Sequence, residues 1–234
     1  MGQAKQRGSR AERIEQALTR AEREPNLAAT MIAPNRADLA RRIIPVYQEM
    51  DAKLAESPAH IDCEAGCSHC CYYHVLITPA EAFALAAFIE ALPAAELESI
   101  QARLTATAAH VAPLSQNEYI TTNIPCAFLD SGRCTVYSMR PNACRGFHSR
   151  DVAVCKRAFD NPRSVEPHAY DQNRQLITLH YKRDWGIAQL RAGCEAAEYE
   201  MHGAVLSALT DPSAFNRWKQ GAVTFPTVHD RTPL

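Results

Sequence analysis

The nonapeptide CEAGCSHCC, residues 63–71, holds four of the nine cysteines in this 234-residue chain. Four thiols so close together are rarely needed for packing alone. Closely spaced thiolates, in contrast, let one turn of backbone present two sulfurs to one ion. The density therefore predicts that this segment is organised by a metal, with Cys63, Cys67, Cys70 and Cys71 as ligands.

Two of these cysteines, Cys70 and Cys71, are neighbours in the sequence. Adjacent side chains diverge by roughly 100° in a helix and point to opposite sides of an extended segment. Neither arrangement suits the chelation of a single ion. The pair is better suited to two metal centres, or to two irons of one polynuclear cluster. His69, among softer ligands, is interpreted as a neighbour of the site and not as a ligand.

A second group of cysteines follows at loop-length separations of 8, 10 and 11 residues: Cys126, Cys134, Cys144 and Cys155. Eight thiols allow two four-sulfur sites for zinc or an iron-sulfur cluster, or one site with spare thiols. The apolar flank of Cys155 fits packing as well as ligation. Cys194 lies 39 residues beyond Cys155 and is interpreted as an ordinary thiol of the core or surface.

The composition is that of an ordinary globular protein, with 47% hydrophobic and 22% charged residues. A net charge of −1 gives no field that favours nucleic acid or an anionic membrane, and the basic residues before position 11 are interpreted as a solvated arm. The longest apolar run, residues 82–89, is far shorter than the about 20 residues that span a bilayer. With no apolar leader visible, we expect a cytoplasmic protein whose thiols stay reduced and serve as ligands.

The fold class predicted is mainly α, with helices packed around a cysteine-rich, loop-built metal site. We divide the chain into a polar N-terminal extension (1–35), a cysteine-cluster metal-binding domain (36–160) and a helical C-terminal segment that packs on it and ends in an irregular tail (161–234). Two helices between the cysteine groups can return the chain to the first group as an αα-hairpin.

Helices are expected at 11–24, 36–55, 79–91, 94–111 and 171–210. Pro45 should kink or divide the second of these, and Gly186 or Gly193 should break the last. Thr78 and Glu81 form a capping-box pattern at the start of the third. In the last helix, Leu176, Leu179, Trp185 and Leu190 are among the residues expected on the buried side, and residues 113–125 are expected to be loop.

The two cysteine groups together resemble the CxxCxxCC signature of the YkgJ-type cysteine-cluster family, a domain described as zinc- or iron-chelating. Residues 126–147, CAFLDSGRCTVYSMRPNACRGF, are similar to that family's block C-x-F-L…G-x-C-x-x-Y-x-x-R-P-x-x-C-R-x-F. The resemblance covers roughly residues 60–150. Three residues separate Cys63 from Cys67 where the family usually has two, and a tight turn at Gly66 can absorb the extra one.

Arg140 and Arg145 flank Cys144 and are predicted to support the site without touching the metal. Four thiolates around Zn²⁺ or an oxidised [4Fe-4S] core leave a charge of about −2, which an arginine can offset. The alternative for Arg140 is an ordinary salt bridge to a local acid such as Asp130. Tyr137 and Phe147 are expected to shield the site from water, and Pro141 to open a short helix.

We favour an iron-sulfur cluster over zinc, because adjacent thiols and an excess of sulfur suit a polynuclear centre. Such a centre would be redox-active or part of a protein-modifying activity; the related flagellin lysine methylases carry a similar cysteine domain. The alternative is a structural zinc module whose helices bind another protein. No phosphate-binding loop or nucleophile elbow is present, so catalytic residues are not assigned.

Overall fold

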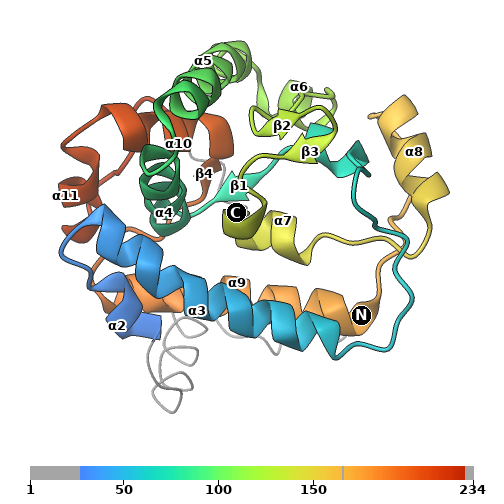
Figure 1. Cartoon of the computed structure of the whole chain (residues 1–234), viewed down its shortest axis with the longest axis horizontal. Helices are drawn as coiled ribbons and strands as arrows, with labels where there is room; N and C mark the ends of the chain where they lie inside the picture. The colour runs from blue at the N-terminus through green and yellow to red at the C-terminus, as the bar shows by residue number, and fades with distance from the viewer. Residues whose placement is uncertain (1–26, 165, 230–234) are drawn as a thin grey trace, which may run out of the picture.

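The computed structural model describes residues 27–164 and 166–229, which are mainly helical (Figure 1). The longer helices are α3 (Arg36–Ala55), α4 (Pro79–Glu90), α5 (Ala94–Val111), α9 (Gln172–Arg191) and α10 (Met201–Thr210). The shorter ones are α2 (Leu27–Met31), α6 (Gln116–Ile120), α7 (Asn142–Gly146), α8 (Val152–Asp160), α11 (Ala214–Lys219) and the 3-10 turns η2 (His69–Tyr72) and η3 (Tyr137–Met139). The predicted mainly α fold is confirmed; the helix expected at 11–24 lies outside the described residues.

Helix α4 begins where the sequence predicts. Glu81 Oε2 accepts the N–H of Thr78 at 3.0 Å, and the Thr78 hydroxyl oxygen accepts the N–H of Glu81 at 3.4 Å. This capping box satisfies two N–H groups that a helix start otherwise leaves unpaired. The remainder of α4 is almost entirely apolar and is buried on nearly every side. It is therefore a central core helix.

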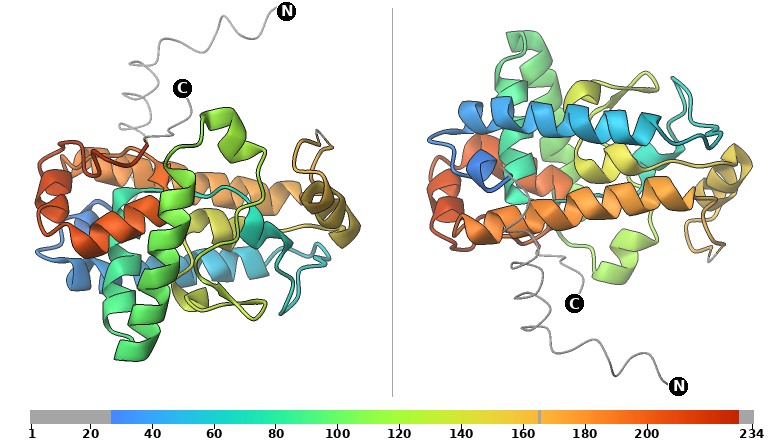
Figure 2. Two further views of the ribbon diagram at one scale, coloured as in Figure 1. Left: turned by 90° about the horizontal axis from the view of Figure 1, so that it is seen from above. Right: turned by 90° about the horizontal axis from the view of Figure 1, so that it is seen from below.

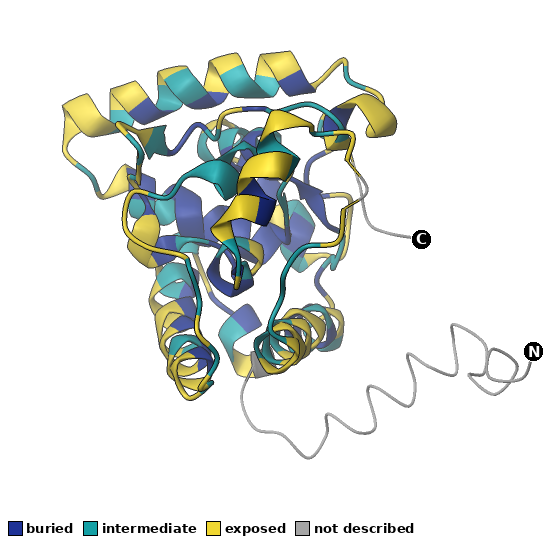
Figure 3. Ribbon diagram, turned by 90° about the vertical axis from the view of Figure 1, so that its right-hand side faces the viewer, coloured by how far each residue is buried: buried dark blue, intermediate teal, exposed yellow. Residues whose placement is uncertain are grey.

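The apolar core is built around α4, which packs against α3 and α10, while α10 also packs against α5. Phe83 is fully buried, and the rings of Phe215, Trp218 and Phe225 lie 5.0, 5.6 and 5.5 Å from its centroid. Figure 1 shows this core on the left and α8 at the opposite end. Figure 3 faces that opposite end and shows buried segments behind a cover of exposed helices and loops. The core thus supports the cysteine segments from one side.

Helices α3 and α9 form a second layer and run in opposite directions (Figure 2). Between them, the Tyr47 and Trp185 rings meet edge-on with centroids 6.5 Å apart. The prediction that Leu176, Leu179 and Leu190 lie on the buried side of the last long helix is wrong. These side chains are 53%, 51% and 48% exposed. The reason is that α9 contacts α2, α3 and α7 through the side that carries Trp185.

Four short strands make two small antiparallel pairs. Strand β1 (Leu76–Ile77) pairs with β4 (Tyr199–Glu200), and β2 (Leu129–Asp130) pairs with β3 (Arg133–Cys134) across a turn at residues 131–132. The first pair matters for the site, because it joins the chain just after the cysteine nonapeptide to the C-terminal segment.

Several expected details need correction. Helix α3 is not divided at Pro45, which lies on its exposed side, where water can pair with the carbonyl oxygen that the proline leaves without a donor. Residues 113–125 are not all loop, because Ser115 and Glu118 form a capping box that starts α6. The chain from 171 to 210 breaks near Gly193, which has a φ of +71°, and not at Gly186.

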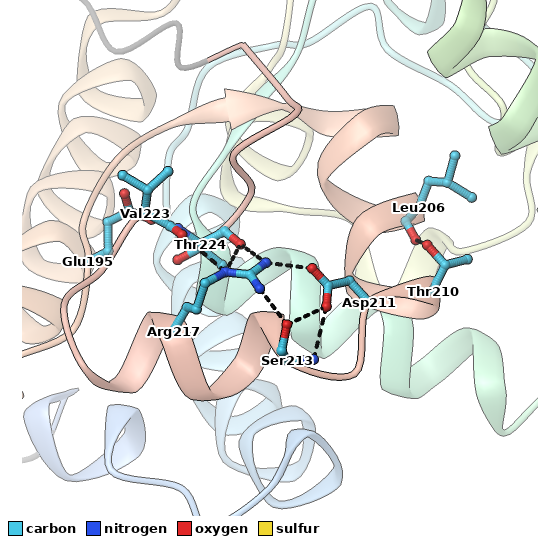
Figure 4. A network of polar contacts seen from close by, with 8 residues as sticks. All are labelled: Glu195, Leu206, Thr210, Asp211, Ser213, Arg217, Val223 and Thr224. Atoms are coloured by element: carbon cyan, nitrogen blue, oxygen red, sulfur yellow. Dashed lines mark hydrogen bonds and ion pairs between the residues drawn. The ribbon is translucent and has the colours of Figure 1, made fainter.

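The C-terminal segment is more ordered than the irregular tail expected, because it contains α11. Figure 4 shows how Arg217 of this helix holds the segment together. Its guanidinium pairs with Asp211 at 2.5 Å and donates to the carbonyl oxygens of Thr224 at 2.7 Å and Val223 at 3.2 Å. These bonds fix the end of α10 to the chain after α11. Within the described residues, no helix has the length and apolar character needed to cross a bilayer.

Candidate metal centre

Backbone hydrogen bonds bring the two cysteine-bearing regions side by side. The N–H of Cys126 donates to the carbonyl oxygen of Cys71 at 2.8 Å, and the N–H of Ile124 donates to that of Tyr72 at 3.1 Å. A Cβ placed on Gly132, in the turn between β2 and β3, would lie only 3.9 Å from the Gly66 carbonyl oxygen. Segments about 55 residues apart in sequence therefore meet along their backbones.

The extra residue between Cys63 and Cys67 is accommodated in a tight turn at Gly66. Its φ of +95° belongs to the left-handed region that glycine adopts without strain, and the N–H of Cys67 closes the turn on the Glu64 carbonyl oxygen at 3.1 Å. The expectation that Gly66 absorbs the longer spacing is confirmed.

Cys63 is tied to the segment that leads into α8. Its sulfur accepts the N–H of Ser149 at 3.3 Å, and the N–H of Asp62 donates to the Ser149 carbonyl oxygen at 2.9 Å. Helix α8, which carries Cys155, also packs against η2. The thiols that affect Cys63 are those of Cys70, Cys67 and Cys155. We call Cys63, Cys67 and Cys155 the Cys63 group.

The remaining cysteines of the second sequence group gather at a different point. Cys134 lies in β3 and Cys144 in α7. The thiols that affect Cys144 are those of Cys126, Cys70 and Cys134. We call Cys126, Cys134 and Cys144 the Cys126 group. The structure thus places Cys155 with the first cysteines of the chain, which its position in the sequence does not indicate.

Cys70 and Cys71 lie between these two groups, in the 3-10 turn η2. Their side chains are in hydrogen-bonding contact, and Cys70 is an electrostatic neighbour of both the Cys63 group and the Cys126 group. This short turn is therefore the junction of the eight thiols.

The thiols are poorly suited to carrying negative charge on their own. Burial, followed by the charges of neighbouring thiols, raises the pKa of Cys144 well above its usual range. For Cys70 the hydrogen bond with Cys71 is the main cause of a raised pKa, and burial adds to it. Burial also raises the pKa of Cys63, Cys134 and Cys155. A cation that neutralised the thiolates would relieve this penalty.

Neither the Cys63 group nor the Cys126 group forms a preassembled metal site. Within the described ranges, no three His, Cys, Asp or Glu side chains are arranged so that they could hold one ion. The eight thiols share a neighbourhood without converging on a single point. Coordination would therefore require rotation of cysteine side chains and small movements of the turns that carry them. The donor set itself, sulfur with no convergent carboxylates, fits zinc or an iron-sulfur cluster and does not fit hard cations.

Comparison with known proteins agrees with this donor set. Residues 62–173 match the family CxxCxxCC, described as a "Putative zinc- or iron-chelating domain". This part of the chain, slightly under half of it, is similar to that family. The resemblance inferred from the two cysteine motifs is thereby confirmed, and metal binding is supported as the general property. No curated protein and no solved structure matches the chain.

Within the matched residues, Arg140 is close to the thiols. Its positive charge favours the thiolate forms of Cys70 and Cys134, against the larger effects that raise their pKa. Its guanidinium lies 4.0 Å from Asp51 and 4.0 Å from the centre of the Tyr137 ring. The ion pair of Arg140 is therefore with Asp51 of α3, and not with a local acid such as Asp130. The role of Arg140 in supporting a bound metal stays a prediction.

Arg145 has a different environment. It forms an ion pair with Asp51 of α3, donates to the Ser138 carbonyl oxygen at 2.7 Å and lies 4.3 Å from the centre of the Tyr47 ring. These contacts hold α7, and with it Cys144, against α3. The predicted role of Arg145 beside the metal is untested, and its observed contacts are those of an anchor.

Aromatic rings border the Cys63 group, although not all those expected. Phe147 packs edge-on against Tyr73 and His168, with centroids 5.7 Å away in both cases. Burial and the charge of Cys155 raise the pKa of Tyr73 to about 12, so this ring lies close to the thiols. Tyr137 is 62% exposed and shields little, because it stacks on Arg140 at the surface.

Sequence reasoning missed other residues that organise the centre. Glu81, besides capping α4, accepts the N–H of Asn142 at 2.8 Å and so fixes the start of α7 two residues before Cys144. His202, which Glu200 holds, lies in the C-terminal segment yet contacts Cys126. Of these, only the capping pattern of Glu81 was visible in the sequence; the other contacts span many residues and carry no local signal.

Proposed function

We propose that the CxxCxxCC domain of this chain binds an iron-sulfur cluster through cysteines of both groups: Cys63, Cys67, Cys70, Cys71, Cys126, Cys134, Cys144 and Cys155. The observation that carries the proposal is the position of the Cys70–Cys71 pair between the Cys63 group and the Cys126 group. One turn of backbone can then supply sulfur to more than one metal atom.

The surroundings support a centre made of several thiolates. Arg140 supplies a positive charge beside Cys70 and Cys134, and buried thiols with raised pKa values gain most from a bound cation. The aromatic rings around the Cys63 group limit the access of water, which is one way that proteins set the potential of a cluster. When bound, an iron-sulfur cluster would supply one-electron chemistry. We place the protein in the cytoplasm, where free thiols persist.

Purification without oxygen tests this proposal. The expected protein is brown and contains iron and acid-labile sulfide, and the absorbance in the visible region bleaches with dithionite. Colourless protein with stoichiometric zinc and no sulfide would contradict it. The variant Cys194→Ala serves as a control, because Cys194 is buried and the charge that acts on its thiol is that of Lys219 and not that of another cysteine.

A structural zinc module that binds another protein is the second candidate. One observation favours it: Leu176, Leu179 and Leu190 are about half exposed along one side of α9. Exposed apolar side chains in a row can form the centre of a protein-protein interface. Substituting Leu176 and Leu179 with Ser would then weaken association measured by light scattering or pull-down without changing metal content.

A further inference from the structure

A buried carboxylate-histidine pair lies beyond the matched CxxCxxCC region and contacts Cys126. Glu200 and His202 are 2% and 4% exposed, and Glu200 Oε1 lies 2.6 Å from His202 Nδ1. The same carboxylate accepts the N–H of His202 at 3.0 Å and the N–H of Gly203 at 2.7 Å. With three acceptor contacts at the start of α10, its position is tightly fixed.

This arrangement orients the imidazole. Because the carboxylate accepts, Nδ1 is the nitrogen that donates, which leaves Nε2 to face the other way. Nε2 accepts the N–H of Ala127 at 3.3 Å, and the His202 side chain also contacts that of Cys126. The Phe128 ring, with its centroid 6.4 Å away, covers the imidazole. Both polar ends of His202 are therefore used, one by Glu200 and one by the backbone and side chain at Cys126.

Backbone hydrogen bonds also join the segment that carries Glu200 and His202 to the residues that follow the first cysteines. Strand β4 sets Glu200 opposite Leu76 of β1, and the N–H of Met201 donates to the Val75 carbonyl oxygen at 3.1 Å. The chain that follows Cys70 and Cys71 is thus bonded directly to the segment that carries His202. Through β1 on one side and Ala127 on the other, Glu200 and His202 join the two cysteine regions.

We propose that Glu200 and His202 are positioning residues of the metal centre, which hold Cys126 in place as a ligand through the hydrogen bond that His202 Nε2 accepts from the adjacent Ala127 N–H and through the contact of the imidazole with the Cys126 side chain. This inference rests on the proposed function only in taking Cys126 as a ligand, for zinc and for an iron-sulfur cluster alike. Carboxylate-histidine pairs that support metal ligands commonly contribute 10–100-fold to metal affinity. The C-terminal segment then contributes directly to the metal centre.

The test compares variants of His202 with the wild-type protein in two measurements. The first is zinc affinity, measured by competition with a chelator, and the second is the sulfur-to-cobalt charge-transfer absorbance of Co²⁺-loaded protein. We expect His202→Ala to weaken zinc binding about 10–100-fold and to change the charge-transfer band, with unchanged stoichiometry at saturating metal. His202→Gln, whose amide can replace Nε2, should restore both. His202→Phe fills the same space beside Phe128 without a nitrogen and should behave like the alanine variant. His180→Ala, at an exposed position of α9, is the matched control.

Wild-type affinity and an unchanged cobalt spectrum in folded His202→Ala and His202→Phe would overturn the inference, as would a loss confined to the thermal stability of the metal-free protein. Loss of a whole metal equivalent that His202→Gln does not restore would make His202 itself a ligand and also overturn it. A wild-type protein that takes up neither zinc nor cobalt would instead refute metal binding as a whole.

Discussion

At the scale of single residues, the cysteines differ in what surrounds them, and this sets what each substitution should do. Cys70 contacts Cys71 and neighbours both thiol groups, and Cys144 sits on a helix that Glu81 and Arg145 hold in place. We expect Cys70→Ser and Cys144→Ser each to lower metal content and thermal stability. Cys194→Ala should leave metal content unchanged, because Cys194 packs in the core. Elemental analysis and thermal melts check this; equal metal loss in all three variants would mean that the thiols are wrongly assigned.

The titration of the thiols leads to a second prediction at this scale. Burial raises the pKa of Cys144 above its ordinary value of 9.0, and the pKa values of Cys63, Cys134 and Cys155 shift in the same direction. A group with a raised pKa in the folded state stabilises the fold below its unfolded pKa and loses that contribution as pH rises through the folded pKa. Metal-free protein should therefore lose stability above about pH 9.

Metal binding has the opposite dependence on pH, because thiols release protons when they coordinate. Affinity for zinc should rise with pH between 6 and 8. Chemical denaturation of metal-free protein and chelator competition measure the two trends. A metal affinity that does not vary with pH would contradict coordination by these protonated thiols.

At the scale of elements, α7 and α9 pack closely next to Cys144. A Cβ on Gly146 would lie 2.2 Å from two atoms of the Thr178 side chain, too close without movement of one helix. We expect Gly146→Ala to destabilise the protein by about 1–3 kcal/mol and to shift α7 with Cys144. Thr178→Ala in the same background should recover part of the loss. Denaturation midpoints test this, and an unaffected midpoint for Gly146→Ala would contradict the observed packing.

The elements also show which structure was predictable. Helix α4 was predicted because its start is encoded locally, by Thr78, Pro79 and Glu81. Helix α6 has a similar local signal in Ser115 and Glu118, but it is only one turn long and lies in a polar stretch that resembles loop. The exposed leucines of α9 could not be identified, because the helix is apolar on more than one side and only its partners decide which side is buried.

At the scale of the whole molecule, the sequence indicated that two cysteine regions would meet but not how. The grouping of Cys155 with Cys63 depends on the backbone hydrogen bond between Asp62 and Ser149, and Arg140 pairs with Asp51 of α3. These contacts join residues about 87–89 positions apart, so no local pattern records them. The same is true of Glu200 and His202. A family motif identifies candidate ligands, whereas the residues that position them come from the fold.

The aromatic cluster around Phe83 lies at one end of the molecule and the cysteines of residues 63–71 lie toward the other (Figure 1), although Cys126 and Cys134 pack against the core. Removal of metal should therefore affect the two ends differently. The aromatic residues around Phe83 do not depend on the cysteines of residues 63–71. Chelation should therefore leave α4 and α10 protected from hydrogen exchange while protection falls in residues 62–71 and 142–160. Hydrogen exchange measured by mass spectrometry distinguishes the ends. Uniform loss of protection over the whole chain would show that the metal holds the entire fold.

The central claim is that several thiolates from both groups hold more than one metal atom. X-ray absorption at the metal edge of anaerobically purified protein tests it most directly. We expect a first shell of sulfur atoms at about 2.3 Å from the metal, as in thiolate sites, together with a second-shell signal from a neighbouring metal. A first shell dominated by nitrogen or oxygen at about 2.0–2.2 Å, with no metal neighbour, would contradict it.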